Sequence, residues 1–347
     1  MRSLRILGLL TVALFLAALP ACRQNSSGKA KVAFVTNNPE SFWTIAEAGC
    51  RKAEGEFNVE VVFRRPSSGD SAEQTEIINT LKNQDIKAMA ISVINPKGQS
   101  AHLDEIAAKM PLITQDNDAP QTKRLCYIGT NNYLAGRSVG EMVKEVLPNG
   151  GVIAIFVGQL EPLNARQRAQ GVLDELDGQP APEDINSIEI SKNKMEFGKY
   201  RLHGIFTDQP EGIQKSVENT KDVLTALAGE KDICLIGLWA YNPPAILTAC
   251  KDKEKLGKVK IIGFDEDAAT LKGIADGYIY GTVVQDPFGF GYESVKMMAA
   301  LAKGDKSVVP EGGIKYVPHR VITKEGGKGR IPVEQFSKDL DALLGKK

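Results

Sequence analysis

This 347-residue sequence has few histidines, no known cofactor motif and no excess of either charge. Its three histidines, His102, His203 and His319, are scattered without the spacing of metal ligands, so we expect no metal site. Basic and acidic side chains are balanced at 43 each, which provides no basic face for a phosphate backbone and argues against a nucleic-acid partner. Phosphate-loop and His-Glu-x-x-His motifs are also absent, and we expect no cofactor.

Long apolar runs are missing too, except at the very start of the chain. Arg2 and Arg5 precede an apolar stretch from Ile6 to Leu19. A short positive region followed by an apolar stretch of this length is typical of an export signal. The stretch is too short to span a membrane comfortably. We therefore expect residues 1–22 to be a signal peptide and the protein to be exported.

The end of this segment, Leu19-Pro20-Ala21-Cys22, resembles a bacterial lipobox. In a lipobox a small residue precedes a cysteine that is lipidated and becomes the mature N-terminus, and Pro20 departs from the usual pattern. We expect Cys22 to anchor the protein by lipid in the periplasm or on the outer face of the cell membrane. Residues 23–28 then form a flexible polar tether. The alternative is a plain cleaved signal with Cys22 incidental.

The remaining cysteines follow no disulfide framework, and no Cys-x-x-Cys is present. Cys50, Cys126, Cys234 and Cys250 each lie in an apolar stretch, where a free cysteine is commonly a small buried side chain. Export permits disulfides, so a bridge between Cys234 and Cys250 stays open as an alternative.

Apolar runs typical of strands alternate with stretches of helical period along the rest of the chain. The strand-like runs are Lys31–Thr36, Val59–Phe63, Ala88–Ile94, Leu112–Gln115, Cys126–Ile128, Val152–Val157, Ile233–Leu238, Lys260–Phe264 and Gly281–Gln285. The helical stretches include Phe42–Glu56, Ala72–Lys82, Leu134–Leu147, Asn164–Leu176, Ile213–Ala228 and Phe288–Lys303. This alternation predicts an α/β fold with parallel sheets covered on both faces.

The number of these units exceeds one comfortable sheet and predicts two similar lobes. The changeover is expected near Gly129–Asn132, where a short strand gives way to a helix. The stretch Lys192–Gln209 breaks the alternation, and we interpret it as a loop or excursion.

Polar and aromatic side chains follow the predicted strands, at the edge where open parallel sheets bind ligands. The candidates are Asn38, Phe42, Trp43, Asp116, Asn117, Asn164, Arg168, Trp239, Tyr241, Asn242, Asp265 and Gln285. Carboxylate, guanidinium and amide groups can each bond two hydroxyls, and aromatic rings cover the C–H faces of a sugar. For any single position, helix capping or core packing explains the residue equally well. Together they predict a pocket for a small polar ligand, with sugar, polyol and nucleoside left open.

The order of these motifs resembles the ribose-binding type of periplasmic sugar-binding protein. The likeness runs from about Lys31 to Val321 and is carried by Asn37-Asn38-Pro39 with Phe42-Trp43, Pro111-Leu112-Ile113-Thr114-Gln115-Asp116, Ile128-Gly129-Thr130-Asn131-Asn132 with Gly136, Asn164-x-Arg166-x-Arg168-x-x-Gly171, Gly263-Phe264-Asp265 and Gln285. This family has a type I periplasmic binding protein fold, in which two doubly wound parallel-sheet lobes are joined by a three-stranded hinge. The resemblance implies an N-terminal lobe of residues 29–131 and 286–318, and a C-terminal lobe of 132–285 and 319–347.

The resemblance also implies a function: a monomer that closes on a monosaccharide and delivers it to an ABC permease in the inner membrane. By position, Asp116 would grip adjacent hydroxyls from one lobe, while Arg168, Asp265 and Gln285 would close from the other. Where the ribose type has Asp-Arg, this sequence has Asp116-Asn117, which removes a positive donor and puts ribose itself in doubt.

Two other function classes remain as alternatives: an exported enzyme acting on a sugar, and a ligand-binding receptor for a sensor kinase or chemoreceptor. Gly136–Gly140 fits the Gly-x-Ser-x-Gly pattern of a nucleophile elbow. An elbow needs a strand directly before the serine, whereas Ser138 is expected inside a helix. We therefore expect a binding protein and not an enzyme.

Overall fold

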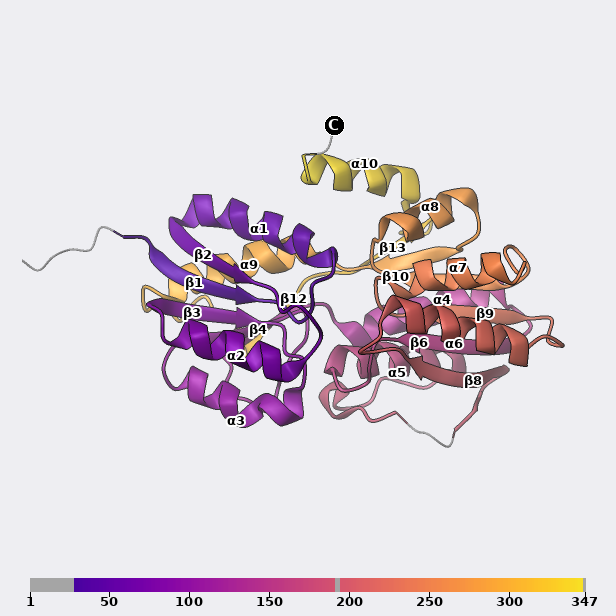
Figure 1. Ribbon diagram of the computed structural model, residues 1–347, viewed down its shortest axis with the longest axis horizontal. Helices are drawn as coiled ribbons and strands as arrows, with labels where there is room; N and C mark the ends of the chain where they lie inside the picture. The colour runs from indigo at the N-terminus through magenta and orange to yellow at the C-terminus, as the bar shows by residue number, and fades with distance from the viewer. Residues whose placement is uncertain (1–27, 191–193, 346–347) are drawn as a thin grey trace, which may run out of the picture.

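The chain folds into two α/β lobes that lie side by side (Figure 1). The computed structural model describes residues 28–190 and 194–345. The predicted signal peptide, Cys22 and the predicted tether up to residue 27 lie outside the described residues. None of the helices in the described part of the chain has both the length and the apolar character needed to cross a bilayer.

The first lobe is built on a six-stranded sheet with the order β12-β5-β4-β3-β1-β2. Every neighbouring pair in it is parallel, as predicted for strands that alternate with helices. The strands are β1 (Ala30–Val35), β2 (Val59–Arg64), β3 (Ile86–Ile91), β4 (Leu112–Gln115), β5 (Cys126–Gly129) and β12 (Ile314–Tyr316). Its helices are α1 (Phe42–Phe57), α2 (Ser71–Lys82), α3 (Pro96–Ala107) and α9 (Pro287–Leu301).

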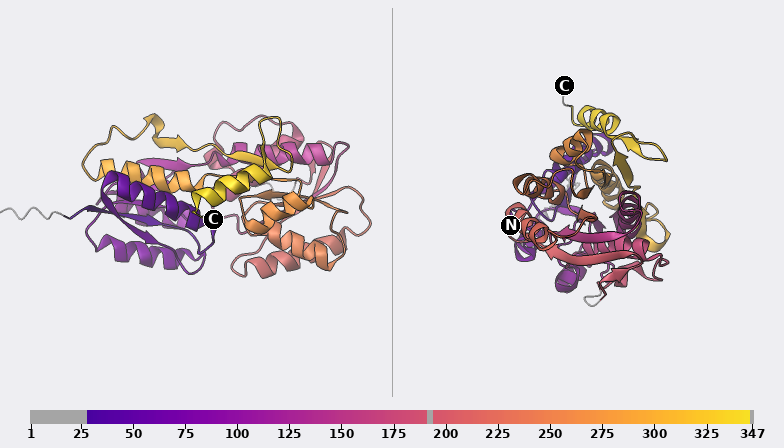
Figure 2. Two further views of the ribbon diagram at one scale, coloured as in Figure 1. Left: turned by 90° about the horizontal axis from the view of Figure 1, so that it is seen from above. Right: turned by 90° about the vertical axis from the view of Figure 1, so that its right-hand side faces the viewer.

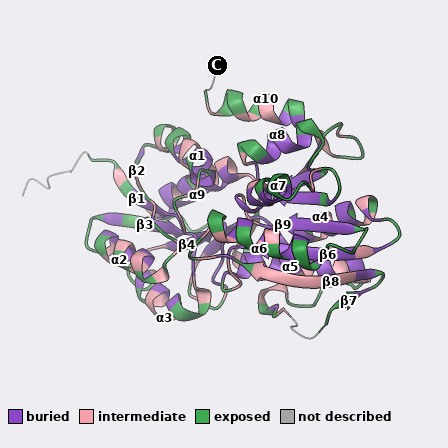
Figure 3. Cartoon of the chain, turned by 45° about the vertical axis from the view of Figure 1, so that its right-hand side comes forward, coloured by how far each residue is buried: buried purple, intermediate pink, exposed green. Residues whose placement is uncertain are grey.

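Alternate side chains of β1 enter the two halves of this lobe's core. Val32 and Phe34 pack with side chains of α1 and α9, whereas Ala33 and Val35 pack with side chains of α2 and α3. All four residues are completely buried, because a sheet covered on both faces has no wet side. Figure 3 shows the exposed residues gathered on the outward surfaces of the helices.

The second lobe is built on an eight-stranded sheet with the order β14-β13-β11-β10-β9-β6-β8-β7. Its strands are β6 (Gly151–Val157), β7 (Glu196–Phe197), β8 (Tyr200–Thr207), β9 (Ile233–Gly237), β10 (Lys260–Phe264), β11 (Gly281–Val284), β13 (Arg320–Thr323) and β14 (Ile331–Pro332). Its helices are α4 (Asn132–Val146), α5 (Leu163–Asp177), α6 (Ile213–Ala226), α7 (Asn242–Asp252), α8 (Ala268–Asp276) and α10 (Val333–Leu343). The two-lobe α/β class predicted from the sequence is therefore confirmed.

The cysteines of the second lobe cannot be bridged. Cys234 on β9 packs in the cluster that faces α4 and α5, whereas Cys250 on α7 packs in the cluster on the opposite face of the sheet. Both thiols are free and buried, as are those of Cys50 and Cys126. The alternative of a Cys234–Cys250 disulfide is wrong, because the sheet lies between the two side chains.

The chain passes between the lobes three times. The connections run from β5 to α4, from β11 to α9 and from β12 to β13, and each is only two or three residues long. Figure 2 shows α9 among the helices of the first lobe, whereas α10, which packs on α8, β13 and β14 of the second lobe, runs back toward the first. The carboxyl ends of β1, β4, β6, β9 and β10 consequently face the space between the lobes.

One segment differs from its prediction. The stretch Lys192–Gln209, interpreted from the sequence as a loop or excursion, begins with two residues that lie outside the described residues. Residues 194–209 contain β7 and the eight-residue strand β8, which pairs in parallel with β6. Because β8 lies next to the sheet edge, Arg201 and His203 remain partly exposed and the apolar alternation is masked.

Candidate functional site

A cavity between the two lobes gathers almost all of the predicted site residues. It is lined by Asn37, Asn38, Glu40, Phe42, Trp43, Asp116, Asn164, Arg168, Trp239, Ala240, Tyr241, Asp265 and Gln285. Two predicted residues, Asn117 and Asn242, do not line it. Asn37, Glu40 and Ala240 do line it and were not among the candidates. The signal for Asn37 was its position directly after β1, beside Asn38.

Two aspartates, one from each lobe, enter this cavity directly after a strand. Asp116 follows β4 and Asp265 follows β10, and both have left-handed backbones, with φ of 58° and 66°. Aspartate and asparagine tolerate this conformation better than other side chains with a Cβ. The turn takes each residue out of its strand at the point where the sheet ends, and both side chains are buried.

The carboxylate of Asp116 is held by neutral donors. Its Oδ2 accepts hydrogen bonds from Ser92 Oγ at 2.7 Å and from Asn37 Nδ2 at 3.3 Å. The Tyr127 hydroxyl lies 2.8 Å from the backbone oxygen of Asp116 and fixes the turn. Burial raises the pKa of Asp116 to about 6, and the charge of Arg168 offsets part of that rise.

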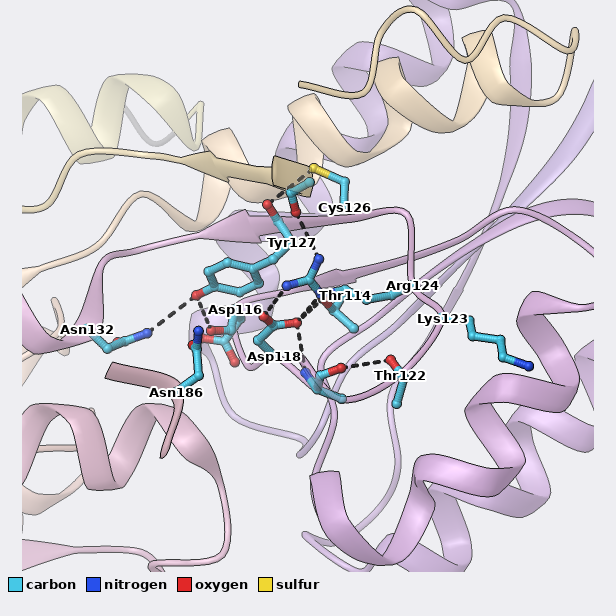
Figure 4. Close-up of polar contacts among 12 residues, drawn as sticks. Thr114, Asp116, Asp118, Thr122, Lys123, Arg124, Cys126, Tyr127, Asn132 and Asn186 are labelled. Atoms are coloured by element: carbon cyan, nitrogen blue, oxygen red, sulfur yellow. Dashed lines mark hydrogen bonds and ion pairs between the residues drawn. The ribbon is translucent and has the colours of Figure 1, made fainter. Parts of the chain in front are cut away.

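The nearby Asp118 has a different environment, shown in Figure 4. Arg124 donates to both of its carboxylate oxygens, at 2.6 and 2.7 Å, and Thr114 Oγ1 donates at 2.5 Å. Arg124 also donates to the backbone oxygen of Gly313 at 2.8 Å, next to β12. This bidentate pair is internally neutral and ties the last strand of the sheet to its neighbours. Arg124 therefore provides no countercharge for the cavity.

Arg168 on α5 lines the cavity and is fixed by three contacts that engage two of its three nitrogens and one face of its guanidinium. Its Nε donates to Asn132 Oδ1 at 2.8 Å and its Nη1 donates to the Leu238 oxygen at 3.0 Å. The guanidinium lies over the Phe264 ring, 4.0 Å from the centroid. Nη2 is buried and has no hydrogen-bond partner among the described residues. The ion-pair contact between Arg168 and Asp265 joins Nη1 to Oδ2 at 4.0 Å, which is long.

Gln285, at the connection from β11 to α9, orients the second aspartate. Its Nε2 donates to Asp265 Oδ1 at 2.9 Å, while its Oε1 is buried and has no hydrogen-bond partner in the part of the chain that the structure describes. Burial raises the pKa of Asp265 and raises that of its neighbour Glu266 still further, where the Asp265 charge adds to the effect. This corner of the second lobe thus concentrates acidic groups.

Aromatic rings enter the cavity from both lobes. Phe42 and Trp43 meet edge to face at 5.0 Å, and Trp43 Nε1 donates to Asn38 Oδ1 at 2.9 Å. On the other side, the Trp239 ring packs against Gly158, where an added Cβ would lie 2.1 Å from a ring carbon. Gly158 therefore permits the position of Trp239.

The Tyr241 hydroxyl is bound by the buried carboxylate of Asp208, to which it donates. The same carboxylate also accepts from Asn242 Nδ2 at 2.8 Å. Burial raises the pKa of Asp208 to about 7, against the effect of these hydrogen bonds. Asn242 is thus engaged beneath the cavity wall, where it also donates to Ser216 Oγ at 3.1 Å.

Asn117 joins the two lobes instead of lining the cavity. Its Nδ2 donates to the Val93 oxygen, and its Oδ1 accepts from the backbone nitrogen of Asn164 at 3.1 Å, across the lobes at the start of α5. A second cross-lobe contact, Lys97 Nζ to Glu189 Oε1 at 2.9 Å, is highly exposed and adds little. The lobes are therefore already in contact on the side of α3 and α5.

Several buried polar atoms around the cavity have no hydrogen-bond partner among the described residues. They are Asn37 Oδ1, Asn164 Oδ1, Arg168 Nη2, Trp239 Nε1 and Gln285 Oε1. Buried polar atoms are nearly always paired in native proteins, so a convergent set of unpaired ones indicates a polar ligand. Among the described residues, no group of three or more His, Cys, Asp or Glu is arranged to hold a metal ion.

Comparison with known proteins identifies the family. The family described as "Periplasmic binding protein domain" matches residues 32–306, and the chain belongs to it. The ribose import binding protein RbsB of Salmonella typhimurium is 22% identical over 293 residues, which cover 81% of this chain and 88% of that protein. The family expected from the sequence is confirmed.

Two solved structures with the same fold were crystallised with a sugar. A solute binding protein of an ABC transporter from Burkholderia graminis, in complex with D-arabinose, has a TM-score of 0.75 at 24% identity, covering 86% of this chain and 96% of its own. A carbohydrate transporter solute binding protein from Agrobacterium radiobacter, also with D-arabinose, has a TM-score of 0.76 at 22% identity, covering 92% and 100%. At these identities the likeness shows the fold.

Proposed function

We propose that this chain is the substrate-binding protein of an ABC importer and that it holds a small polyhydroxylated ligand, a monosaccharide, between its lobes. The observation that carries the proposal is the set of buried, unpaired donors and acceptors that converge on one cavity from both lobes. Arg168 Nη2 and Trp239 Nε1 are hydrogen-bond donors, whereas the amide oxygens of Gln285 and Asn164 are acceptors. A sugar hydroxyl both donates and accepts, so one ring can satisfy both kinds of atom.

The aromatic rings support the same ligand class. Phe42 and Trp43 on one side and Trp239 on the other offer flat apolar faces for the C–H groups of a sugar ring. Because the ligand would touch both lobes only when they are closed, its binding energy would favour the closed form, with the three short connections acting as the hinge. The predicted ligand-binding residues that line the cavity keep that role here.

The names of the relatives agree with this proposal. RbsB is a ribose import binding protein, and the structural neighbours are transporter proteins that hold D-arabinose. A binding protein returns its ligand unchanged, which separates it from an enzyme. Ser138 lies within α4, away from any strand-to-helix turn, so the Gly-x-Ser-x-Gly pattern gives no support to a hydrolase.

A thermal-shift screen of the protein lacking residues 1–22 tests the proposal against monosaccharides, disaccharides, polyols and nucleosides. A ligand at about 100 times its dissociation constant raises the free energy of unfolding by about 2.7 kcal/mol. For lobes of this size that is a rise in Tm of roughly 5–10 °C. No shift with any sugar, or conversion of the sugar to a product, would contradict the proposal.

We also propose a cellular location, based on the predicted signal peptide of residues 1–22 and on Cys22. The protein would be exported, held at the membrane through a lipid on Cys22, and would present its closed, monomeric form to a permease in the inner membrane. Replacing Cys22 by Ser should release the protein from washed membranes into the soluble fraction. Membrane retention equal to that of wild type would show that Cys22 is not the anchor.

A further inference from the structure

The charges around the cavity do not balance. Its wall contains three acidic side chains, Glu40, Asp116 and Asp265, and one basic side chain, Arg168. Glu266 follows Asp265 with both carboxylate oxygens buried and unpaired among the described residues. Acidic groups therefore outnumber basic groups at the place where the ligand is expected.

The single guanidinium is also poorly placed to neutralise the aspartates. Two of the three Arg168 nitrogens are already engaged, by Asn132 Oδ1 and by the Leu238 oxygen. The nearest approach of Arg168 to Asp265 is the 4.0 Å contact of Nη1, and among the described residues the Asp265 carboxylate accepts a hydrogen bond only from the neutral Gln285 amide. No ion pair joins Asp116 to a basic side chain in the described ranges.

Other nearby bases are likewise committed or distant from the wall. Arg124 is held by both oxygens of Asp118, on the far side of the Asp116 turn. Arg320 donates to the backbone oxygen of Gln285 and lowers the pKa of Glu266, but it does not line the cavity. Behind Tyr241, Asp208 adds a further acidic group.

The unpaired atoms show the same excess of acceptors. Within residues 28–190 and 194–345, three amide oxygens, of Asn37, Asn164 and Gln285, have no partner, against one nitrogen each of Arg168 and Trp239. Burial raises the pKa values of Asp116 and Asp265, as expected for carboxylates that lack a close countercharge. An ammonium group provides three donors and a charge, and aromatic faces such as that of Trp239 also favour cations.

We propose that the ligand of this cavity is a polyhydroxylated amine, an amino sugar whose ammonium group lies against the two aspartates, Asp116 and Asp265, that face the cavity from opposite lobes. The inference rests on the proposed sugar-binding function and specifies its ligand. The ring hydroxyls would bond Arg168 Nη2 and the unpaired amide oxygens. A buried charge is tolerated when it is paired and hydrogen-bonded, and the ligand would provide that pairing.

Matched sugars provide the test. Calorimetric titrations would compare D-glucose, D-galactose and D-mannose with their 2-amino-2-deoxy and 6-amino-6-deoxy forms, with the uncharged N-acetylated amines as size controls. At least one amino sugar should bind about tenfold or more tightly than both its neutral parent and its N-acetyl form, and more weakly as salt increases. A neutral parent that binds as tightly as its amines would overturn the inference and leave the sugar-binding function intact. Binding of no sugar in any form would overturn both.

The variant Asp116→Asn isolates the role of charge, because it keeps the shape and the acceptor oxygen. In this variant the preference for amine over parent should fall at least about fivefold. The exposed Asp222 on α6 supplies the matched control, and Asp222→Asn should keep the full preference. An undiminished preference in Asp116→Asn would show that its carboxylate does not hold the amine.

Discussion

The carboxylate of Asp116 should make the ligand-free protein less stable at neutral pH than it would be with a neutral side chain. Burial moves its pKa from an ordinary 3.8 to about 6. A tenfold change in proton affinity corresponds to about 1.4 kcal/mol, so ionising this group in the native state at pH 7 costs roughly 3 kcal/mol. Replacement by asparagine removes that cost.

The gain is partly offset by a weaker hydrogen bond. The pKa of about 6 already includes the hydrogen bond from Ser92, which favours the charged form. Asn37 would donate to a neutral amide oxygen in Asp116→Asn, and this weaker bond offsets part of the gain, since a bond to a charged acceptor is stronger by about 1 kcal/mol. The net expectation at pH 7 is a stabilisation of about 1–2 kcal/mol, or a rise in Tm of roughly 2–8 °C. Asparagine also tolerates the left-handed backbone at this position, which alanine would not.

The sign of the pH dependence follows from the raised pKa. Between about pH 4 and pH 6 the native state keeps a proton that the unfolded chain has already lost, so rising pH destabilises wild type. Below pH 4 both states are protonated and the cost disappears. Thermal unfolding followed by circular dichroism at several pH values would measure both proteins. A variant less stable than wild type at pH 7, or a difference independent of pH, would refute this reasoning.

Three further predictions concern the residues around the ligand. In Arg168→Lys the fixed fork is lost, so ligand affinity should fall by about tenfold or more with an unchanged circular dichroism spectrum; normal affinity would mean that the guanidinium does not reach the ligand. In Gly158→Ala the new methyl must displace the Trp239 ring, so both the ligand affinity and the ligand-induced change in tryptophan emission should decrease. If the variant titrates like wild type, the ring lies outside the pocket. In Asn117→Ala the hydrogen bond to Asn164 across the lobes is lost, which removes about 1 kcal/mol from the closed form. The ligand should therefore dissociate several-fold faster in stopped-flow measurements, and an unchanged rate would show that this contact does not hold the lobes together.

Much of the fold was predictable from the sequence because the strands of covered parallel sheets are continuous apolar runs. The strands β1, β4, β6 and β10 lie where those runs are. The strand β8 was not predictable in this way, because it lies beside the sheet edge and its partly exposed Arg201 and His203 interrupt the apolar pattern.

The candidate site was predictable to the level of strand ends, because the carboxyl ends of parallel strands meet at one edge. Which side chain of a neighbouring pair faces the cavity was not predictable. The left-handed turn at Asp116 directs that carboxylate into the cavity and leaves Asn117 to join the lobes. Likewise, Asn242 lies under the wall because Asp208, from a segment predicted as a loop, binds it there.

The balance of acidic and basic groups in the cavity could not be predicted from the sequence either. Among 43 acidic side chains, nothing in their spacing distinguishes Asp118, which is neutralised by Arg124, from Asp116, which is not. Only the three-dimensional arrangement shows where negative charge is left without a close partner.

The central claim, that this chain binds a sugar between its lobes and returns it unchanged, is tested most directly by a calorimetric titration followed by recovery of the ligand. The mature protein would be titrated with the sugar that gives the largest thermal shift, and the ligand would then be released by denaturation and examined by mass spectrometry. We predict one ligand per chain, a loss of affinity in Asp265→Asn, which tolerates the left-handed backbone at this position, and recovery of the sugar intact. A sugar recovered as a reaction product, or bound with the same affinity by Asp265→Asn, would contradict the account.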